Sequence, residues 1–238
     1  MFDKLRAYCF IDPLIIAATI LMGSINLLVA FFDRGGDKQL LVARTWARML
    51  CRIAGVRLRI RGIEAVDLKR NYILCVNHLS YMDTPVVLGH LPFNFRFMAK
   101  KGLFDIPFMG WHLRHAGHLP VALDNPREGI RTLNEAARLI QERGTSVLIF
   151  PEGGRSPNGE LQPFRDGAFY LAIKSGVPIL PVALVGTYEM LPMGSGVIRP
   201  GVVEMRIAPP IVTAGCDLKQ RAALSEEVRA QITRLRNS

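Results

Sequence analysis

The chain has 238 residues, half of them apolar and 21% charged, and its formal net charge is +10. This length holds one large domain or two small ones with a sizeable core, and the hydrophobicity excludes an intrinsically disordered protein. A basic excess of this size indicates a polyanionic partner, for which nucleic acid, anionic lipid and phosphorylated small molecules are the classes to weigh.

The first predicted element is an apolar helix of membrane length. The run from Pro13 to Phe32 has 20 residues and no charge, and as a helix it would measure about 30 Å, the thickness of a hydrocarbon core. The residues after it do not resemble a signal-peptide cleavage site, which needs small side chains. Because proline, glycine, serine and asparagine interrupt the run, a single span, a broken helix and a re-entrant hairpin all fit it, as does a buried core helix.

The next stretch is basic. Arg44, Arg48 and Arg52 recur every four residues and form one stripe on a helix, with apolar residues such as Trp46 on the opposite arc. This pattern favours an amphipathic helix on an anionic lipid surface, and a core-packed helix with a solvated arginine face is the alternative. We therefore predict a membrane-associated helical segment over residues 1–54, and the positive-inside tendency places the remaining domain on the cytoplasmic face of the membrane.

From Val56 onward, strand patterns alternate with helix patterns. Strands are predicted at Val56–Arg61, Tyr72–Val76, Phe95–Ala99, Val121–Leu123, Ser146–Phe150, Ile179–Val185 and Val203–Ile207. Helices are predicted at Arg127–Glu142, at Asp166–Lys174, and in the tail, where Leu224, Val228, Ile232 and Leu235 stand at helical spacing. The alternation predicts an α/β sheet covered by helices. We place it in one domain spanning residues 55–238.

A histidine and an aspartate follow the second predicted strand, in the segment Asn77-His78-Leu79-Ser80-Tyr81-Met82-Asp83. Histidine titrates near neutrality and can act as a general base, and a carboxylate bonded to its ring would fix the tautomer. On an ideal helix the two side chains would lie about 140° apart, so they can meet only across a turn. The alternative is that Asp83 is a helix N-cap and His78 a loop residue.

A glycine-rich segment follows the predicted strand that ends at Phe150. It reads Phe150-Pro151-Glu152-Gly153-Gly154-Arg155-Ser156. Glycines let backbone amides turn toward an anion, and an arginine can hold a phosphate by two parallel hydrogen bonds. Glu152 could accept a substrate hydroxyl or fix Arg155. The segment Pro163–Ala168 follows and is predicted to close the same site, whereas a tight surface loop is the alternative.

These two segments resemble the first and third motifs of the glycerolipid acyltransferases, and most closely the 1-acylglycerol-3-phosphate acyltransferase family. Lys101–Trp111 and Gly176–Val182 resemble further family segments, and the likeness covers roughly residues 56–213. Four motifs in the same order make a specific signal, whereas a single H-x₄-D would be weak. The resemblance implies a mixed sheet flanked by helices.

The resemblance also implies a reaction. His78 would be the general base that takes the proton from an acceptor hydroxyl, and Asp83 would orient and charge-stabilise it. The hydroxyl would attack the thioester of an acyl-CoA or an acyl-carrier-protein, making phosphatidic acid at the sn-2 position. The loop of Glu152, Gly153, Gly154, Arg155 and Ser156 would bind the acceptor's phosphate and glycerol. No metal and no cofactor beyond the acyl donor is implied.

Two positions depart from the family pattern. Gly154 stands where the third motif usually has threonine, which should change loop flexibility more than charge. Leu123 stands where the second motif usually has an arginine that binds the acceptor phosphate. The cations that could replace that arginine are Lys100, Lys101, Arg127 and Arg155.

The departure at Leu123 keeps a second acceptor class open: a different lyso-lipid, such as a lysophospholipid or a lyso-aminolipid. A thioesterase-like hydrolase and a non-catalytic lipid-binding protein also fit the sequence. The expected partners are an anionic bilayer, a lyso-lipid acceptor and an acyl-thioester donor. Nucleic acid is not expected, because the sequence contains neither a zinc finger nor an aromatic-rich RNA-binding signature.

Overall fold

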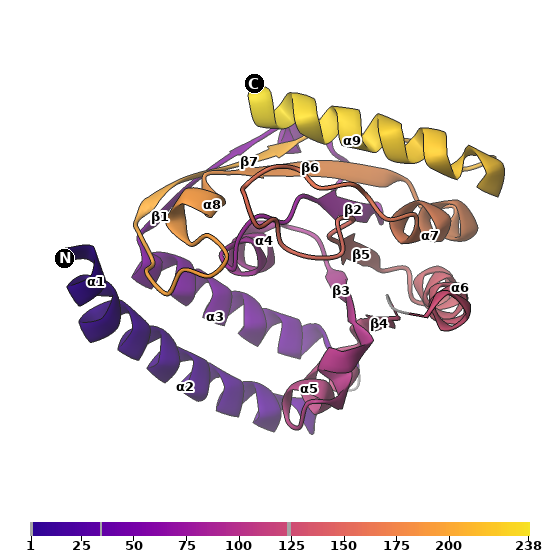
Figure 1. Ribbon diagram of the computed structural model, residues 1–238. Coiled ribbons are helices and arrows are strands. Elements are labelled where there is room, and N and C mark those ends of the chain that lie inside the picture. Colours follow the sequence, from indigo (N-terminus) through magenta and orange to yellow (C-terminus); the bar gives the residue numbers. More distant parts are fainter. Residues whose placement is uncertain (1, 34, 123–124) are drawn as a thin grey trace.

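A single mixed sheet organises the molecule (Figure 1). The computed structural model describes residues 2–33, 35–122 and 125–238. Within them the strand order is β1-β7-β6-β2-β5-β3-β4, and each neighbouring pair is parallel apart from β6 and β7. The strands are β1 (Val56–Arg61), β2 (Ile73–Val76), β3 (Phe95–Lys100), β4 (Leu119–Val121), β5 (Ser146–Ile149), β6 (Ile179–Val185) and β7 (Gly201–Ile207). The predicted α/β class with a mixed sheet is confirmed.

Helices cover both faces of this sheet. The longer ones are α2 (Asp12–Ala30), α3 (Asp37–Ala54), α6 (Pro126–Arg143) and α9 (Arg221–Asn237). The shorter ones are α1 (Phe2–Arg6), α4 (Asp83–His90), α5 (Met109–His115), α7 (Gly167–Ser175) and α8 (Thr187–Met190). A π-helical segment at Ala7–Ile11 joins α1 to α2, and 3₁₀ turns lie at Ile63–Ala65, Lys101–Asp105 and Leu218–Gln220.

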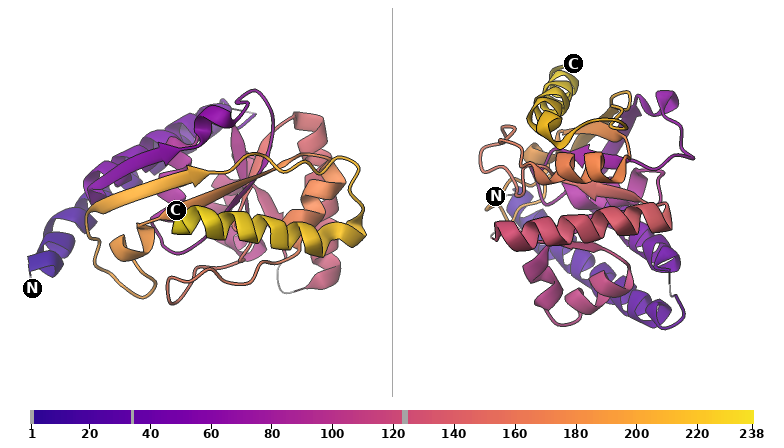
Figure 2. Two further views of the ribbon diagram at one scale, coloured as in Figure 1. Left: turned by 90° about the horizontal axis from the view of Figure 1, so that it is seen from above. Right: turned by 90° about the vertical axis from the view of Figure 1, so that its right-hand side faces the viewer.

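Two hydrophobic cores result from the alternation of side chains along the strands. In β2, Leu74 and Val76 pack with residues of α3 and α4, whereas Ile73 and Cys75 face residues of α6, α7 and α9. Successive strand residues point to opposite faces, so a buried parallel strand reads as a continuous apolar run. Figure 2 shows α9 lying along one face, with the α2–α3 pair beyond the other. Burial raises the pKa of the Cys75 thiol to about 12, which keeps it protonated.

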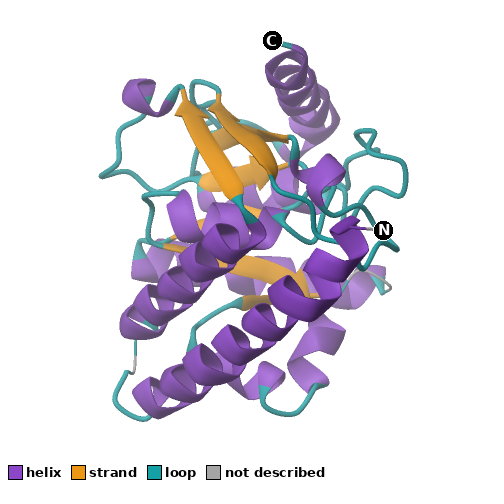
Figure 3. Ribbon diagram, turned by 90° about the vertical axis from the view of Figure 1, so that its left-hand side faces the viewer, coloured by secondary structure: helices purple, strands orange, loops and turns teal. Residues whose placement is uncertain are grey.

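The N-terminal helices form a hairpin beside the sheet. Figure 3 shows α2 and α3 running side by side, and the two pack closely against one another. The Asp33 carboxylate accepts hydrogen bonds from Gly36 N and Gln39 N, at 3.1 and 2.8 Å, and so fixes the start of α3. The helical stretch Lys4–Ala30 is long and apolar enough to cross a bilayer, and most of it is not buried by the rest of the protein.

The arginine stripe of α3 has a different role from the one predicted for it. Arg44 donates to the carbonyls of Leu91 and Phe93, and Arg48 Nε donates to Gly89 O at 2.7 Å. Both side chains therefore satisfy carbonyls at the C-terminal end of α4, where a cation is also favoured by the helix dipole. The stripe was predicted to face lipid headgroups; two of its three arginines instead bind the neighbouring helix.

The division of the chain at residues 54 and 55 remains a prediction. In the structure α3 ends at Ala54 and β1 begins at Val56, so the change from helical hairpin to sheet falls at the expected place in the chain. The short strand predicted at Val121–Leu123 lies instead at Leu119–Val121. Leu123 itself lies outside the described residues.

Candidate active site

The two motif loops emerge at one edge of the sheet. Strands β2 and β5 are parallel neighbours with Cys75 opposite Ile149, so the residues after both strands leave the sheet on the same side. This edge, beyond the carboxyl ends of parallel strands, is where α/β folds place their sites. The register explains how residues about 70 positions apart in the sequence form a common site.

Asn77 fixes the start of the first loop. Its amide donates from Nδ2 to Leu184 O at 3.0 Å and accepts at Oδ1 from Leu184 N at 2.7 Å. The fully buried side chain thus extends the pairing of β2 with β6 by one residue. An amide can make both bonds because it carries a donor and an acceptor. This positions His78 at the point where the chain turns away from the sheet.

His78 and Asp83 meet across a turn. The two residues are joined by a hydrogen bond of 2.9 Å between His78 Nδ1 and Asp83 Oδ2. The same carboxylate oxygen accepts from the backbone nitrogens of Leu79 and Ser80, at 2.6 and 2.8 Å. Asp83 is the first residue of α4, but its carboxylate points back over the preceding turn rather than capping the helix. The predicted meeting of the two side chains is found, and the N-cap alternative is not.

The orientation of the imidazole follows from these contacts. Because the buried carboxylate holds Nδ1–H, the neutral ring has its lone pair on Nε2. The ring stacks on Phe150, with 3.8 Å between centroids and 13° between planes. The hydrogen bond and the stacking together fix the imidazole at the wall of a cavity, a geometry that is compatible with general-base chemistry.

Glu152 joins the two loops. Its two carboxylate oxygens accept from His78 N at 2.6 Å and from Gln162 N at 2.8 Å. Burial raises the pKa of this carboxyl to about 7, an effect that outweighs the two backbone donors and to which the charge of Asp83 adds. Glu152 was predicted to contact substrate or Arg155; the structure places it behind the cavity wall, where it holds the backbone of His78.

The glycine-rich loop brings its arginine to the cavity. The Arg155 guanidinium lies 4.0 Å from the centroid of the Tyr81 ring, a cation–π contact. Gly153 has a φ of 75°, and a Cβ there would come within 2.6 Å of Arg165 Nε. The positive φ favours glycine at this position, whereas the end of the Arg165 side chain could shift to make room for a Cβ. At Gly154 an added Cβ would meet nothing within 4 Å, so a threonine side chain would have room there.

Ser156 is buried and holds the two loops together from the other side. Its backbone nitrogen donates to His78 O at 2.8 Å, and its hydroxyl donates to Asn158 Oδ1 at 3.0 Å. The hydroxyl also accepts from Gln162 Nε2 at 3.3 Å. Like Glu152, Ser156 lies behind the cavity wall, whereas Gly153, Gly154 and Arg155 line the cavity.

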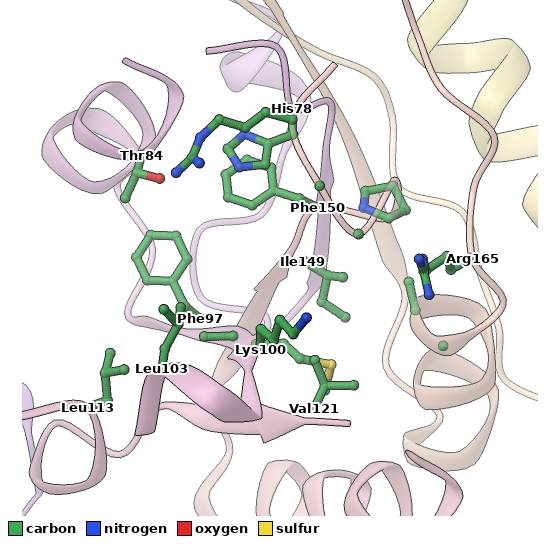
Figure 4. Close-up of a pocket in the computed structure, with 18 residues that line it drawn as sticks. His78, Thr84, Phe97, Lys100, Leu103, Leu113, Val121, Ile149, Phe150 and Arg165 are labelled. Carbon is green, nitrogen blue, oxygen red and sulfur yellow. The ribbon is translucent and has the colours of Figure 1, made fainter. Parts of the chain in front are cut away.

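The cavity has a volume of about 370 Å³ and combines an apolar wall with cations (Figure 4). Its apolar side chains include Phe97, Met98, Leu103, Leu113, Val121, Ile149 and Phe150. Its cationic side chains are Lys100, Arg155 and Arg165. In Figure 4 the stacked rings of His78 and Phe150 stand opposite Phe97 and Lys100. A base, an anion-binding set of cations and an apolar wall suit a substrate that has both a phosphate and a hydrocarbon chain.

A family model described as "Acyltransferase" matches residues 57–185, the part of the chain that forms this site. A chloroplastic 1-acyl-sn-glycerol-3-phosphate acyltransferase of Brassica napus is 33% identical over 99% of this chain and 68% of its own length. The chain belongs to the 1-acyl-sn-glycerol-3-phosphate acyltransferase family. The protein is therefore an acyltransferase.

Further relatives agree with this assignment. A yeast (Saccharomyces cerevisiae) enzyme with the same descriptive name is 31% identical over 82% of this chain, which spans 64% of the yeast protein. A chloroplastic relative from Arabidopsis thaliana is 34% identical over 80% of this chain, and the match covers 52% of that protein. The crystal structure of the 1-acyl-sn-glycerophosphate acyltransferase PlsC from Thermotoga maritima superposes with a TM-score of 0.80 at 28% identity, covering 98% of this chain and 95% of that one.

The structure separates the cations that were suggested as substitutes for the motif arginine. Lys100 and Arg155 line the cavity, whereas Lys101 pairs with Glu128 outside it. Arg127, another suggested substitute, is exposed on α6. Arg165 lines the cavity from the segment that was predicted to close the site, so the position of that segment was predicted but the importance of its arginine was not.

Proposed function

We propose that this acyltransferase moves a fatty acyl group from an acyl thioester to the sn-2 hydroxyl of 1-acylglycerol-3-phosphate, which makes phosphatidic acid. The observation that carries the proposal is the hydrogen-bonded pair of His78 and Asp83 at the wall of a cavity that is apolar on one side and cationic on another. The names of the relatives support this choice of acceptor.

The proposed reaction uses His78 as the general base. Nε2 takes the proton from the acceptor hydroxyl as its oxygen bonds to the thioester carbonyl carbon. The tetrahedral intermediate then expels the thiolate by breaking the C–S bond, and the imidazolium returns the proton to sulfur. Asp83 stabilises the imidazolium and holds the tautomer. General-base help is worth about 10²- to 10⁴-fold, and much of the remaining acceleration comes from positioning the two substrates.

The acceptor's phosphate is assigned to the cationic side of the cavity. Lys100, Arg155 and Arg165 come from three different segments and line the same space as His78. Arginine binds phosphate through two parallel donors, and lysine acts as a point charge. In this proposal these residues supply the positive charge that the family's second motif usually provides at the position of Leu123.

The membrane is proposed as the source of the acceptor. Large apolar side chains of the hairpin are exposed, among them Leu14, Ile16, Ile20, Leu21, Leu28, Phe31 and Phe32. Burying such side chains in hydrocarbon is favourable, and an exposed patch of this kind marks a membrane or protein contact. We place this face in the bilayer with the sheet domain on the cytoplasmic side, where acyl-CoA or acyl-carrier-protein would be the donor.

The test measures transfer of a labelled acyl chain to 1-acylglycerol-3-phosphate by membranes that contain the protein. His78→Ala should reduce kcat/KM by at least about 10²-fold, whereas the matched variant His115→Ala, at an exposed histidine of α5, should keep it. An acceptor-free reaction measures hydrolysis. Unchanged transfer by a folded His78→Ala protein, or turnover that needs no acceptor, would refute the proposal.

A second acceptor class is favoured by Leu123. Without the usual arginine at that position, the cavity could prefer a lyso-lipid whose headgroup carries less negative charge. The same assay with lysophospholipids and a lyso-aminolipid as acceptors decides this. A His78-dependent preference of about tenfold or more for one of them over 1-acylglycerol-3-phosphate, worth about 1.4 kcal/mol, would replace the proposed acceptor but leave the mechanism in place.

A further inference from the structure

Strand β1 carries an arginine at every second position, and the proposed function uses none of them. Arg57, Arg59 and Arg61 are exposed, with 65% of the Arg59 side chain and 60% of the Arg61 side chain accessible. The alternate residues Val56 and Leu58 pack against the core that α3 and α4 share. Because successive strand residues point to opposite faces, the three arginines, here called the arginine face, point to the side of the sheet that α9 covers.

One carboxylate of the neighbouring strand serves this face. Glu204 of β7 bonds to Arg206 of the same strand at 2.8 Å, and it lies 3.8 Å from Arg59 and 3.6 Å from Arg61. The two longer distances exceed the 2.7–2.9 Å, or about that, of a charge-assisted hydrogen bond. Arg61 also stands directly opposite Arg206, and like charges in that position repel. On these two strands positive charge therefore exceeds negative charge, and the exposed guanidinium groups can bind a further anion.

The position of the arginine face favours a soluble partner over lipid. The exposed apolar side chains that we place in the bilayer belong to α2, and the α2–α3 pair lies on the opposite side of the sheet from α9 (Figure 2). A membrane that contacts the hairpin leaves the α9 side directed to water. The partner that suits the arginine face is therefore an acidic molecule in solution.

The arginine face is also at the level of the candidate active site. Arg59 stands opposite Glu204, which stands opposite Val185 of β6. Val185 directly follows the residue that the Asn77 amide holds, and Asn77 precedes His78. In the sheet order β1 is three strands from β2, about 14 Å at the usual strand spacing. A thioester donor bound on this face would need a flexible connection of that order between its binding surface and its sulfur.

The spacing of the arginines suits a protein surface. Alternate residues of a strand are about 6.6–6.8 Å apart, and acidic residues one turn apart on a helix are about 5–6 Å apart, so a row of one can face a row of the other. The planar fork of arginine binds both oxygens of a carboxylate. A nucleotide such as that of CoA binds in a concave pocket, whereas the arginines stand on an exposed edge strand.

We infer that the arginine face binds an acidic acyl-carrier-protein, whose carboxylates contact Arg57, Arg59 and Arg61 while its thioester reaches His78. The prosthetic arm of the carrier supplies the flexible connection. The inference rests on the proposed function, in which an acyl thioester is the donor, and it names the carrier protein as the form of that donor which this surface recognises.

The test compares palmitoyl-acyl-carrier-protein with palmitoyl-CoA as donors to 1-acylglycerol-3-phosphate, with the full chain in membranes. In the variant Arg57→Gln, Arg59→Gln, Arg61→Gln, kcat/KM for the carrier-bound donor should fall about tenfold, the effect expected from losing three exposed charge pairs. For palmitoyl-CoA it should change less than about twofold. An equal fall with both donors, or no fall with the carrier-bound donor, overturns the inference.

A matched control removes the same number of charges from the helices on that side of the sheet. Arg138, Lys174 and Lys219 are exposed on α6, on α7 and in the turn before α9. The variant Arg138→Gln, Lys174→Gln, Lys219→Gln should keep kcat/KM for both donors within about twofold of wild type. A tenfold fall for the carrier-bound donor in this control would show that net charge, and not the arginine face, is responsible, and would overturn the inference.

Two further measurements on the arginine variant test other roles for the same side chains. Flotation with anionic vesicles measures lipid binding, and size-exclusion chromatography measures self-association. Charged side chains on an edge strand can serve to prevent pairing with another chain. A variant that loses vesicle binding or self-associates, with its use of the two donors unchanged, assigns the arginines to lipid or to edge protection and overturns the inference. We expect neither change.

Binding measured without chemistry separates this inference from the catalytic proposal. The probe is the carrier protein with its prosthetic arm but no acyl chain, titrated by calorimetry into a His78→Ala protein. Adding the three arginine substitutions should raise its Kd about tenfold. Equal Kd values, or no binding to either protein, overturn the inference even if acyl transfer is established. A raised Kd together with no transfer from either donor would support the docking surface and refute the proposed function.

Discussion

At the scale of single residues, one buried carboxylate oxygen organises the site. Asp83 Oδ2 accepts two backbone N–H groups as well as the His78 ring nitrogen. The backbone donors satisfy and orient the charge, so the carboxylate is already in place for the cationic ring of the proposed mechanism. Glu152, on the other loop, also positions His78, but it accepts a hydrogen bond from the backbone nitrogen of His78 and does not contact the ring.

Asp83→Asn tests the charge of the carboxylate. The amide oxygen would take the place of Oδ2, because the backbone nitrogens of Leu79 and Ser80 donate to that position, so Nδ1–H keeps its acceptor but the imidazolium of the proposed mechanism loses its negative partner. We expect kcat/KM for acyl transfer to fall at least about 10²-fold while the circular dichroism spectrum stays unchanged. The control is Asp105→Asn, at an exposed aspartate. Near-normal transfer by a folded Asp83→Asn enzyme would contradict this role.

Glu152 makes the stability of the fold depend on pH. Its pKa is about 7 in the folded protein against 4.5 as the reference value, so between these values the folded state holds a proton that the unfolded state has released. The free energy of unfolding should therefore fall as pH rises from 4.5 to 7, by about 3 kcal/mol. Denaturant titrations across this pH range should show the fall in wild type and not in Glu152→Gln. An equal pH dependence of the free energy of unfolding in the two proteins would contradict the prediction.

At the scale of elements, the α3 arginines illustrate what periodicity can and cannot predict. The spacing of Arg44, Arg48 and Arg52 correctly predicted a helix with one basic face, and α3 runs from Asp37 to Ala54. Periodicity does not specify what the face contacts. Both water and the carbonyls at the C-terminal end of a neighbouring helix can accept the hydrogen bonds of an arginine. The packing of α3 on α4 determines which of them Arg44 and Arg48 contact.

Arg44→Met should therefore destabilise the fold. Arg44 is half-buried and bonds to two carbonyls, those of Leu91 and Phe93. A hydrogen bond to a charged group is worth about 1.5–3 kcal/mol, so we expect a loss of about 2 kcal/mol in the free energy of unfolding. Arg52→Met, at the exposed end of the stripe, should change it by less than about 0.5 kcal/mol. If both variants lose only vesicle binding, the stripe faces lipid.

The strands were predicted better than the short helices. β1 and β6 have the predicted bounds, because alternation and continuous burial leave clear patterns over six or seven residues. α5 was not predicted, since seven residues are too few to establish a helical period. β4 begins two residues before the predicted strand and contains Pro120. A proline is tolerated there because β4 is an edge strand, bonded only to β3 in the described sheet.

The candidate site was predicted only in part, because some of its residues meet through a local turn and others through the order of the strands. His78 and Asp83 are five residues apart, so a local turn brings them together and the sequence sufficed to pair them. Lys100 and Arg165 reach the cavity only because β3, β5 and the loop after β5 are neighbours in space. Strand order is a property of the whole chain, and local sequence does not contain it.

At the scale of the whole molecule, the hairpin gives the protein an apolar side and the sheet domain carries most of the charge. Ile16 and Ile20 on α2 are 57% and 65% exposed, and they stand one turn apart on the outer face. An apolar helix face beside a basic domain suits a bilayer that is apolar inside and anionic at the surface.

The double variant Ile16→Lys, Ile20→Lys should weaken the attachment to lipid. Burying an isoleucine side chain is worth about 1.5–3 kcal/mol, so the partition coefficient onto anionic vesicles should fall at least about tenfold in a flotation assay. Ile130→Lys, at a similarly exposed isoleucine of α6, should leave it unchanged. Equal loss in both variants would show that added charge, and not the hairpin face, is responsible.

The pairing of β1 with β7 sets an order of events during synthesis. β1 follows the hairpin directly, yet its hydrogen-bonding partner is the last strand of the described sheet, with Val56 opposite Gly201. Contacts between such distant segments form slowly. While the ribosome makes the residues between them, the hairpin is already available to lipid and β1 presents an open edge that could pair with another chain. If the hairpin binds lipid as proposed, attachment before closure would hold nascent chains at the bilayer surface and apart from one another.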